Sequence, residues 1–281
     1  MKRRDSERQD HSLEVEFAAL CKMYDLQGLL MGDSDLFTAA VEAFEMSYDE
    51  KTPVHVSEAT FSSEQWMAKL TLSDALNVHL FLFVHRDQSK KIHCFDITLE
   101  SYASRDAAHS ILTEDQFVEW WRNHKTTIQT KSYRPELTAT IKESYFDNLL
   151  ERNGLKWGGN VDGFVVVTGG NDFSPLAIIE NRFTRNESIF QYDPAKYFSD
   201  DYQTWKPLKL ICRALNIPLF LCVYSKRNTE QRLIALAEIK FEEDGLLYRN
   251  NIHPYENIFR DLQLAKEWLM SSIDRYKKGG K

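Results

Sequence analysis

Two stretches of the chain share one pattern of hydrophobic and polar positions. In residues 205–223, apolar side chains first recur at helical spacing, and Asn216 then interrupts them. Residues 217–224 follow as a continuous apolar run, which is typical of a strand buried on both faces. The pattern therefore predicts a helix, a short turn and a buried strand, and residues 66–84 predict the same three elements.

The two stretches are also related residue by residue. Without a gap, residues 66–84 and 205–223 are identical at eight of 19 positions, where unrelated sequences would match at about one. The identical pairs are Trp66/Trp205, Ala75/Ala214, Leu76/Leu215, Asn77/Asn216, Leu80/Leu219, Phe81/Phe220, Leu82/Leu221 and Val84/Val223. Weaker similarity extends upstream, between residues 25–45 and 161–183. We infer that one folding unit has been duplicated.

The duplication predicts two domains. Polar residues predominate over residues 124–135, which places a boundary there. We expect one lobe in residues 1–130 and the other in residues 131–281. Each lobe ends in an amphipathic helix, and the helix of the first lobe has a capping-box start at Thr113 and Gln116.

Composition and charge are those of an ordinary globular protein. Of the 281 residues, 43% are hydrophobic and 27% are charged, and the net charge is −7. Residues 1–140 carry 15 Lys and Arg against 23 Asp and Glu, whereas the remaining residues carry 20 against 19. A polyanionic partner would therefore bind the second half of the chain in preference to the first.

Neither membrane insertion nor disulfide bonding is predicted. No window approaches 18 uninterrupted apolar residues, and the basic N-terminus leads into acidic residues instead of an apolar signal segment. The four cysteines form no CxxC pair, so we expect buried free thiols in a reducing cytoplasm. These cysteines are Cys21, Cys94, Cys212 and Cys222.

A predicted hairpin in the second copy brings charged residues together. Residues 162–167 and 175–180 each predict a strand, and a Gly-rich turn separates them. If the turn pivots at its centre, Asp162 lies directly opposite Glu180, about 5 Å away. Arg182 lies two residues beyond Glu180 and therefore on the same face of the sheet.

Two interpretations of these charges stay open. The carboxylate pair would hold a divalent cation such as Mg²⁺ or Mn²⁺, which would neutralise charge on a scissile phosphate and lower the pKa of a bound water. Alternatively, Arg182 neutralises the pair, or a register shift of one residue places Asp162 and Glu180 on opposite faces of the sheet.

The order of elements around the hairpin is also informative. An acid begins one strand, the other strand ends in apolar-apolar-Glu-x-basic, and a helix and a buried strand follow. This order resembles the restriction-endonuclease-like PD-(D/E)XK nuclease superfamily, over about residues 141–240. The resemblance implies an α/β fold of two tandem αβββαβ lobes, with mixed sheets flanked by helices. It also implies that Asp162 and Glu180 are metal ligands and catalytic residues, with Arg182 in the position of the motif's lysine.

The resemblance suggests supporting residues as well. Glu143 or Glu151 would match the acid that some members place on the first helix. Arg182 does not lose its proton, so it would orient the attacking water or stabilise the transition state instead of acting as a general base. Lys196 or Lys206 would then substitute for the motif's lysine, although solvated surface lysines are the favoured interpretation of both.

The first copy departs from the motif. Gln27 aligns with Asp162, or Asp25 does with a shift, and Phe44 takes the cationic position, where it cannot bind a phosphate. We therefore expect the first lobe to be a degenerate, non-catalytic partner. Residues 36–46 also fit a helix, because alanine favours that structure.

The sequence thus predicts a metal-dependent nuclease that hydrolyses phosphodiester bonds, in DNA in preference to RNA. A role in bacterial defence or DNA processing is implied by the resemblance alone. The alternative is a catalytically inactive, nuclease-like interaction subunit of a larger assembly, which the negative net charge and Arg182 favour. A protein partner that activates or recruits the chain is a further expectation left open. A nucleic-acid binder that lacks cleavage is a third interpretation.

Overall fold

The two structural units of the chain, seen in a computed structural model, do not coincide with the two halves of the sequence. Unit 1 comprises Met1–Arg8 and Gln27–Gly158, and unit 2 comprises Gln9–Leu26 and Gly159–Lys281. The structure describes residues 2–3, 12–47, 61–86, 89–125, 144–167, 173–184, 187–192, 202–225, 227, 229–242, 245–247 and 257–279.

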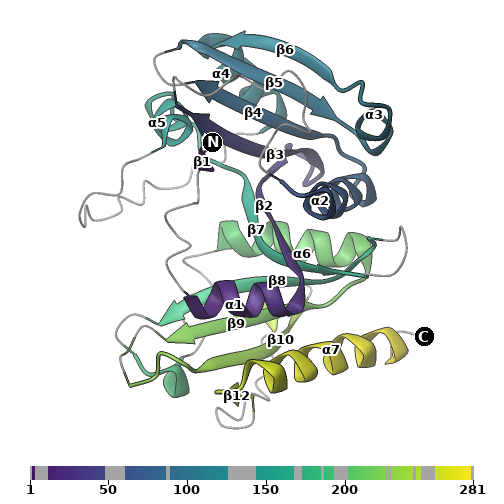
Figure 1. Ribbon diagram of the computed structural model, residues 1–281, viewed down its shortest axis with the longest axis vertical. Coiled ribbons are helices and arrows are strands. Elements are labelled where there is room, and N and C mark those ends of the chain that lie inside the picture. Colours follow the sequence, from purple (N-terminus) through teal and green to yellow (C-terminus); the bar gives the residue numbers. More distant parts are fainter. Residues whose placement is uncertain are drawn as a thin grey trace. The chain divides into compact units, whose positions relative to one another are not determined.

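Unit 1 contains a mixed sheet in the order β2-β3-β4-β5-β6 (Figure 1). Strands β3 and β4 are parallel, and the other neighbours in this order are antiparallel. The strands are β1 (Lys2–Arg3), which pairs with β3, β2 (Met23–Met31, of which residues 27–31 belong to this unit), β3 (Phe37–Met46), β4 (Leu80–Arg86), β5 (Lys91–Ile97) and β6 (Ala108–Thr113). The helices are α2 (Ser63–Ala75), α3 (Leu99–Ser104), α4 (Glu114–His124) and α5 (Tyr145–Arg152).

Unit 2 contains strands of a mixed sheet in the order β7-β8-β9-β10-β11. Strands β8 and β9 are parallel, as β3 and β4 are in unit 1, and the other neighbours in this order are antiparallel. The strands are β7 (Gly159–Val166), β8 (Pro175–Thr184), β9 (Leu219–Ser225), β10 (Ile234–Glu242), β11 (Gly245–Leu247) and β12 (Ile258–Phe259), which pairs with β10. The helices are α1 (Ser12–Cys21), the 3-10 helix η2 (Ile189–Gln191), α6 (Tyr202–Leu215) and α7 (Leu262–Gly279).

The backbone confirms the predicted helix, turn and strand in both copies. Asn77 follows α2 with φ 56°, and Asn216 follows α6 with φ 49°, so each helix ends through a left-handed asparagine. The strand that follows, β4 or β9, then pairs in parallel with the second strand of the preceding hairpin, in an equivalent register. The equivalent pairs are Ala40–Leu80 and Ile178–Leu219.

The first helix of each sequence half packs in the unit that contains most of the other half. Helix α1 precedes β2 in the sequence, yet it belongs to unit 2, where Phe17 and Cys21 are buried. Helix α5 precedes β7, yet it belongs to unit 1, where Phe146 and Leu149 are buried. The units therefore differ from the predicted domains 1–130 and 131–281. Each unit buries the apolar face of the helix that begins the other half of the sequence, and we call α1 and α5 the exchanged helices.

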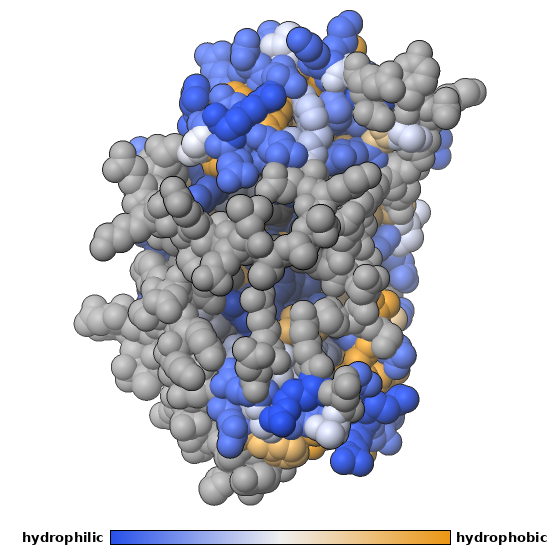
Figure 2. Space-filling model, turned by 90° about the vertical axis from the view of Figure 1, so that its left-hand side faces the viewer, coloured by the Kyte–Doolittle hydropathy of each residue, from blue (hydrophilic) through white to orange (hydrophobic). Residues whose placement is uncertain are grey.

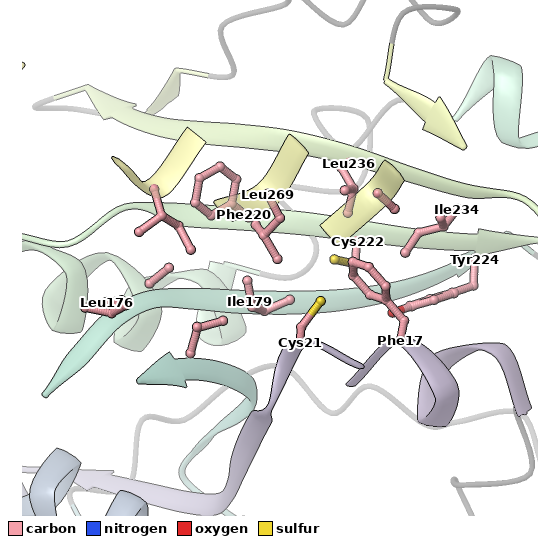
Figure 3. Close-up of a cluster of buried hydrophobic side chains, with 14 residues drawn as sticks. Phe17, Cys21, Leu176, Ile179, Phe220, Cys222, Tyr224, Ile234, Leu236 and Leu269 are labelled. Atoms are coloured by element: carbon pink, nitrogen blue, oxygen red, sulfur yellow. The ribbon is translucent and has the colours of Figure 1, made fainter. Parts of the chain in front are cut away.

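The core of unit 2 shows how the exchanged helix is held. Phe17 and Cys21 of α1 lie beside Cys222 and Tyr224 of β9 (Figure 3). Leu269 of α7 belongs to the same cluster, and α1 and α7 contact each other. Burying a side chain such as Phe17 stabilises a fold by about 1.5–3 kcal/mol, so α1 contributes substantially to unit 2.

Polar contacts additionally fix α5 in unit 1. Tyr145 donates its backbone N–H to Oε1 of Glu45, at 2.7 Å, and its hydroxyl to Oε1 of Glu114, at 2.8 Å. Trp157 donates its ring N–H to Oδ1 of Asp147, at 2.7 Å. Because Glu45 lies on β3 and Glu114 on α4, these hydrogen bonds connect the exchanged helix to the sheet and to its neighbouring helix.

The α/β class and the mixed sheets flanked by helices are confirmed in each unit. Between α5 and α6, the described residues form two strands, β7 and β8, whereas the αβββαβ pattern has three. The alternative of a helix over residues 36–46 is wrong, because Phe37–Met46 is a strand. Burial on both faces of the sheet outweighs the helix propensity of its alanines.

The four cysteines are buried free thiols, as predicted. Burial raises the pKa of Cys21 and of Cys94 to about 12. Burial also raises the pKa of Cys212 and Cys222. Since the thiolate is the reactive form, burial disfavours reaction of these side chains at neutral pH.

The described part of the surface is mainly hydrophilic in the view of Figure 2, with small hydrophobic groups among the polar side chains. The exposed large hydrophobic side chains among the described residues are Val15, Leu36, Ile111 and Leu264. Within the described ranges, no helix combines the length and the apolar character that crossing a membrane requires.

Candidate functional site

The hairpin of β7 and β8 has the register that the sequence predicts. Gly163 pairs with Ile179, the last pair of this ladder, and Asp162 and Glu180 are the next residues outward on the two strands. A register shift lies nearer the turn and does not affect this end of the hairpin. The alternative of a one-residue error, with the two acids on opposite faces, is therefore not supported.

Asp162 is half-buried and acts as a hydrogen-bond acceptor. Its Oδ2 accepts the backbone N–H of Asn181, at 3.0 Å, and its Oδ1 accepts the side-chain amide of Asn160. Asn181 in turn donates its side-chain amide to Glu14 of α1, at 3.0 Å. Asp162 thus joins β7 to β8 and, through Asn181, is connected to the exchanged helix.

Glu180 is 2% exposed and ion-paired within its own strand. Its Oε1 lies 2.9 Å from Nη2 of Arg182. The guanidinium carbon of Arg182 lies 5.4 Å from the ring centroid of Trp205 on α6, a distance at which a cation and an aromatic face attract each other. Arg182 is therefore held by the Glu180 carboxylate and by an indole ring.

Unit 1 contains an equivalent buried glutamate. Glu42 of β3 corresponds to Glu180 of β8, and its Oε1 lies 2.7 Å from Nζ of Lys69 on α2. Both side chains are 0% exposed. Nζ of Lys69 also lies 4.5 Å from the ring centroid of Phe61, so this cation too is placed against an aromatic ring.

The contact made by Asp162 recurs in unit 1 as well. Oε1 of Gln27 accepts the backbone N–H of Ala43, at 2.5 Å, as Oδ2 of Asp162 accepts that of Asn181. The backbone N–H of Gln27 donates to Oε1 of Glu42, at 3.3 Å. The alignment of Gln27 with Asp162 is thus confirmed, and an uncharged amide makes the same contact to the backbone.

The cation that neutralises the glutamate comes from different positions in the two units. Phe44 of unit 1 occupies the position of Arg182, and Leu208 of unit 2 occupies the position of Lys69. Each unit therefore has one cation and one apolar residue at these two positions. Because an unpaired buried carboxylate costs several kcal/mol, both arrangements meet the same requirement of the fold.

The predicted supporting residues fall in different parts of the chain. Glu151 is exposed on α5 and belongs to unit 1, whereas Asp162 and Glu180 belong to unit 2. Lys206 is half-buried on α6, next to Trp205 in the sequence. Glu143 and Lys196 lie outside the described residues.

The residues present fit a divalent cation poorly. Where the structure describes the chain, no group of three His, Cys, Asp or Glu side chains is placed to hold a metal ion. Mg²⁺ requires only one or two carboxylates when water and phosphate oxygens complete its shell. However, the guanidinium of Arg182 lies 2.9 Å from Oε1 of Glu180 and would compete with the metal for this oxygen.

Lys69 is the residue of this arrangement that the sequence did not identify. The sequence does contain one signal of its importance. In the alignment of the two copies, Lys69 stands where the second copy has the apolar Leu208. A buried lysine requires a buried partner, but the sequence alone does not show that the partner is Glu42, 27 positions away on another element.

Glu230 is a second buried carboxylate with a defined role in unit 2. It accepts hydrogen bonds from the Ser188 hydroxyl at 2.7 Å, the Ile189 backbone N–H at 3.0 Å and the Ser225 hydroxyl at 2.8 Å. Burial opposes its ionisation, but these hydrogen bonds outweigh burial and lower the pKa of Glu230. The carboxylate thereby attaches η2 to the end of β9.

Comparison with known proteins adds no family to this geometry. No protein-family model matches the chain, and no curated protein and no solved structure matches it either. Any function assigned to the chain therefore depends on its own residues and their arrangement.

Proposed function

We propose that the chain is a non-enzymatic interaction protein, in which both lobes are catalytically inactive and serve a larger assembly. One observation carries the proposal. Each unit buries a glutamate on the second strand of its hairpin and neutralises it with an internal cation, through the pairs Glu42–Lys69 and Glu180–Arg182.

The positions of the two cations support a structural role for these glutamates. A metal-binding carboxylate must be reached by a hydrated cation and by a phosphodiester. Glu180 is 2% exposed, and the Glu42–Lys69 pair has no exposed side-chain surface. The two units place their cations at different positions, Lys69 on α2 and Arg182 on β8. What they share is therefore only that a cation neutralises the buried glutamate.

Charge supports the same proposal. Proteins that bind nucleic acid derive much of their affinity from lysine and arginine contacts to phosphates. The chain carries 42 Asp and Glu against 35 Lys and Arg, which gives a net charge of −7. Such a balance is poorly suited to binding a polyanion and is compatible with binding another protein.

A metal-dependent nuclease is the second candidate, and the register of the hairpin favours it. Gly163 pairs with Ile179, and Asp162 and Glu180 are the next residues outward, where two ligands of one Mg²⁺ or Mn²⁺ ion would lie. In this candidate, the metal ion replaces Arg182 as the partner of Glu180. Arg182 then contacts a phosphate of DNA. Arg182 would act electrostatically, because it cannot accept a proton.

A cleavage assay separates these candidates. Purified protein is incubated with supercoiled DNA, linear DNA and RNA, with Mg²⁺, with Mn²⁺ or with EDTA, and binding is measured in parallel. We expect neither cleavage nor binding. Cation-dependent cleavage that is lost in Asp162→Ala and Glu180→Gln would establish the nuclease, and binding without cleavage would establish a nucleic-acid binder.

A thermal unfolding experiment tests the role of Glu180 even if an activating partner is absent. If the glutamate neutralises Arg182, Glu180→Gln lowers the melting temperature, and Mg²⁺ or Mn²⁺ leaves that of the wild type unchanged. Glu42→Gln in unit 1 is the matched variant and should behave in the same way. If Glu180 is a metal ligand, the cation raises the melting temperature of the wild type, and Glu180→Gln removes this increase.

A further inference from the structure

Two histidines of unit 1 face each other across β5 and β6, which are neighbouring strands (Figure 1). His109 of β6 pairs with Phe95 of β5, two residues beyond His93, so His93 and His109 lie diagonally on one face of the sheet. Nδ1 of His93 lies 3.0 Å from Nε2 of His109, and the two rings are 9° from parallel. Two nitrogens of a metal-binding residue type are therefore in direct contact.

A buried aromatic ring fixes this histidine pair at the surface. The ring of His109 stacks on that of Phe95, with 4.4 Å between the ring centroids and 11° between the planes. Phe95 is 1% exposed, whereas His93 is half-buried and His109 is exposed. The pair thus has a defined position and is open to solvent.

The separation of the two nitrogens matches that of two ligands on one metal ion. An imidazole nitrogen binds Zn²⁺ at about 2.0–2.1 Å, and imidazole also suits Cu²⁺ and Ni²⁺. Two such bonds at an angle of about 90–110° place their nitrogens about 2.8–3.4 Å apart. The 3.0 Å between His93 and His109 lies within this range. Each ring then needs only to rotate, so that its lone pair points at the ion instead of at the other ring.

We propose that His93 and His109 form a two-histidine site for a divalent transition-metal ion of the class of Zn²⁺ and Ni²⁺. Without a metal, the two rings share one hydrogen bond, in which one nitrogen is the donor and the other the acceptor. When the ion binds, the proton of this hydrogen bond moves to the other nitrogen of its own ring. Both rings stay neutral, and both facing nitrogens become ligands.

Water completes the coordination shell in this proposal. In the parts of the chain that the structure describes, no third His, Cys, Asp or Glu side chain joins the pair. The site is therefore an open one, in which positions of the metal ion remain available to water or to another small ligand.

The charges around His93 affect the site in two ways. Burial lowers the pKa of His93, and the charges of His109, Lys91 and Arg86 lower it further. The ring is therefore neutral at pH 7, which is the form that binds a metal. Lys91 and Arg86 also repel a bound cation, so we expect an affinity well below that of a closed zinc site with four protein ligands.

Calorimetric titration of the full-length protein with Zn²⁺ and with Ni²⁺ tests the site. We expect saturable binding of both ions, and His93→Asn or His109→Asn should each lower the affinity about tenfold or more, because a single imidazole remains. His79→Asn is the matched control and should leave the affinity unchanged. His79 is 55% exposed, and its Nδ1 lies 2.7 Å from Oδ1 of Asp96 instead of facing a second imidazole.

Thermal unfolding provides a second readout and checks that the variants fold. Zn²⁺ should raise the melting temperature of the wild type and of His79→Asn, but not that of His93→Asn or His109→Asn. No saturable binding of either ion up to about 1 mM, unchanged affinity in the His93 and His109 variants, or an equal loss in His79→Asn would overturn the proposal. Because these ions differ from the Mg²⁺ and Mn²⁺ tested at Glu180, the outcome is independent of the function proposed above.

Discussion

Lys69 is a fully buried cation whose replacement should be costly. Its ammonium lies 2.7 Å from Oε1 of Glu42, and neither side chain is exposed. Lys69→Met leaves the Glu42 carboxylate buried without this ammonium, so we expect the free energy of unfolding to fall by about 3–5 kcal/mol. Denaturant titration measures the change.

The double variant Glu42→Gln/Lys69→Met is the control for this prediction. It removes both charges together, so it should recover most of the stability that Lys69→Met loses. A loss below about 1 kcal/mol in the single variant would mean that the buried pair is not an energetic unit.

Glu230 makes the stability of unit 2 depend on pH. Its pKa is lowered in the folded state, so its contribution is complete above the unfolded-state pKa of about 4.3 and is lost as the pH falls through the lower, folded value. Glu230→Gln should therefore melt at a lower temperature than the wild type at pH 7. The difference should shrink steadily as the pH is lowered below about 4. Melting curves of both proteins from pH 3 to 7 check this dependence, and a constant difference would contradict it.

Residue-level prediction succeeded where local periodicity decides the geometry. The register of β7 and β8 follows from the predicted pivot of the hairpin, and the pairing of Gly163 with Ile179 confirms it. The Glu42–Lys69 pair was not predicted, because it depends on how α2 packs on the sheet. No local pattern near Lys69 identifies a carboxylate on β3 as its partner.

At the scale of secondary structure, the least predictable part of the fold is the unit in which each exchanged helix packs. The sequence predicts the hairpin of β7 and β8, since two short apolar runs flank a Gly-rich turn. It does not show which sheet an amphipathic helix covers. Because the two units are related, the apolar face of α1 or α5 is compatible with either sheet, and only tertiary packing selects one.

The exchange predicts which unit a core substitution weakens. Phe146 lies in the second half of the sequence but packs in unit 1, so Phe146→Ala should destabilise unit 1 by about 3–5 kcal/mol. Hydrogen exchange should then quicken at the amides of β3 and β4 more than at those of β8 and β9. The matched variant Phe17→Ala should produce the reverse pattern, and faster exchange confined to β8 and β9 in Phe146→Ala would refute the exchange.

At the scale of the whole molecule, neither half of the sequence contains all the elements of one unit. Residues 1–130 lack α5, which covers part of the unit 1 core, and residues 131–281 lack α1, which covers part of the unit 2 core. We expect each fragment alone to show no cooperative thermal transition, because it leaves apolar sheet surface uncovered.

Mixing the two fragments should restore the missing helices and a cooperative transition, which circular dichroism measures. A cooperative transition in an isolated fragment, with the same melting temperature as the full chain, would show that the exchanged helix is dispensable.

The exchange of α1 also has a consequence during synthesis. Phe17 leaves the ribosome long before Phe220, which belongs to the same buried cluster of unit 2. At about 5–20 residues per second, the apolar face of α1 waits about 10–40 s for that part of the sheet to be translated. The nascent chain therefore carries this apolar face without its partners on the sheet until most of the polypeptide has emerged.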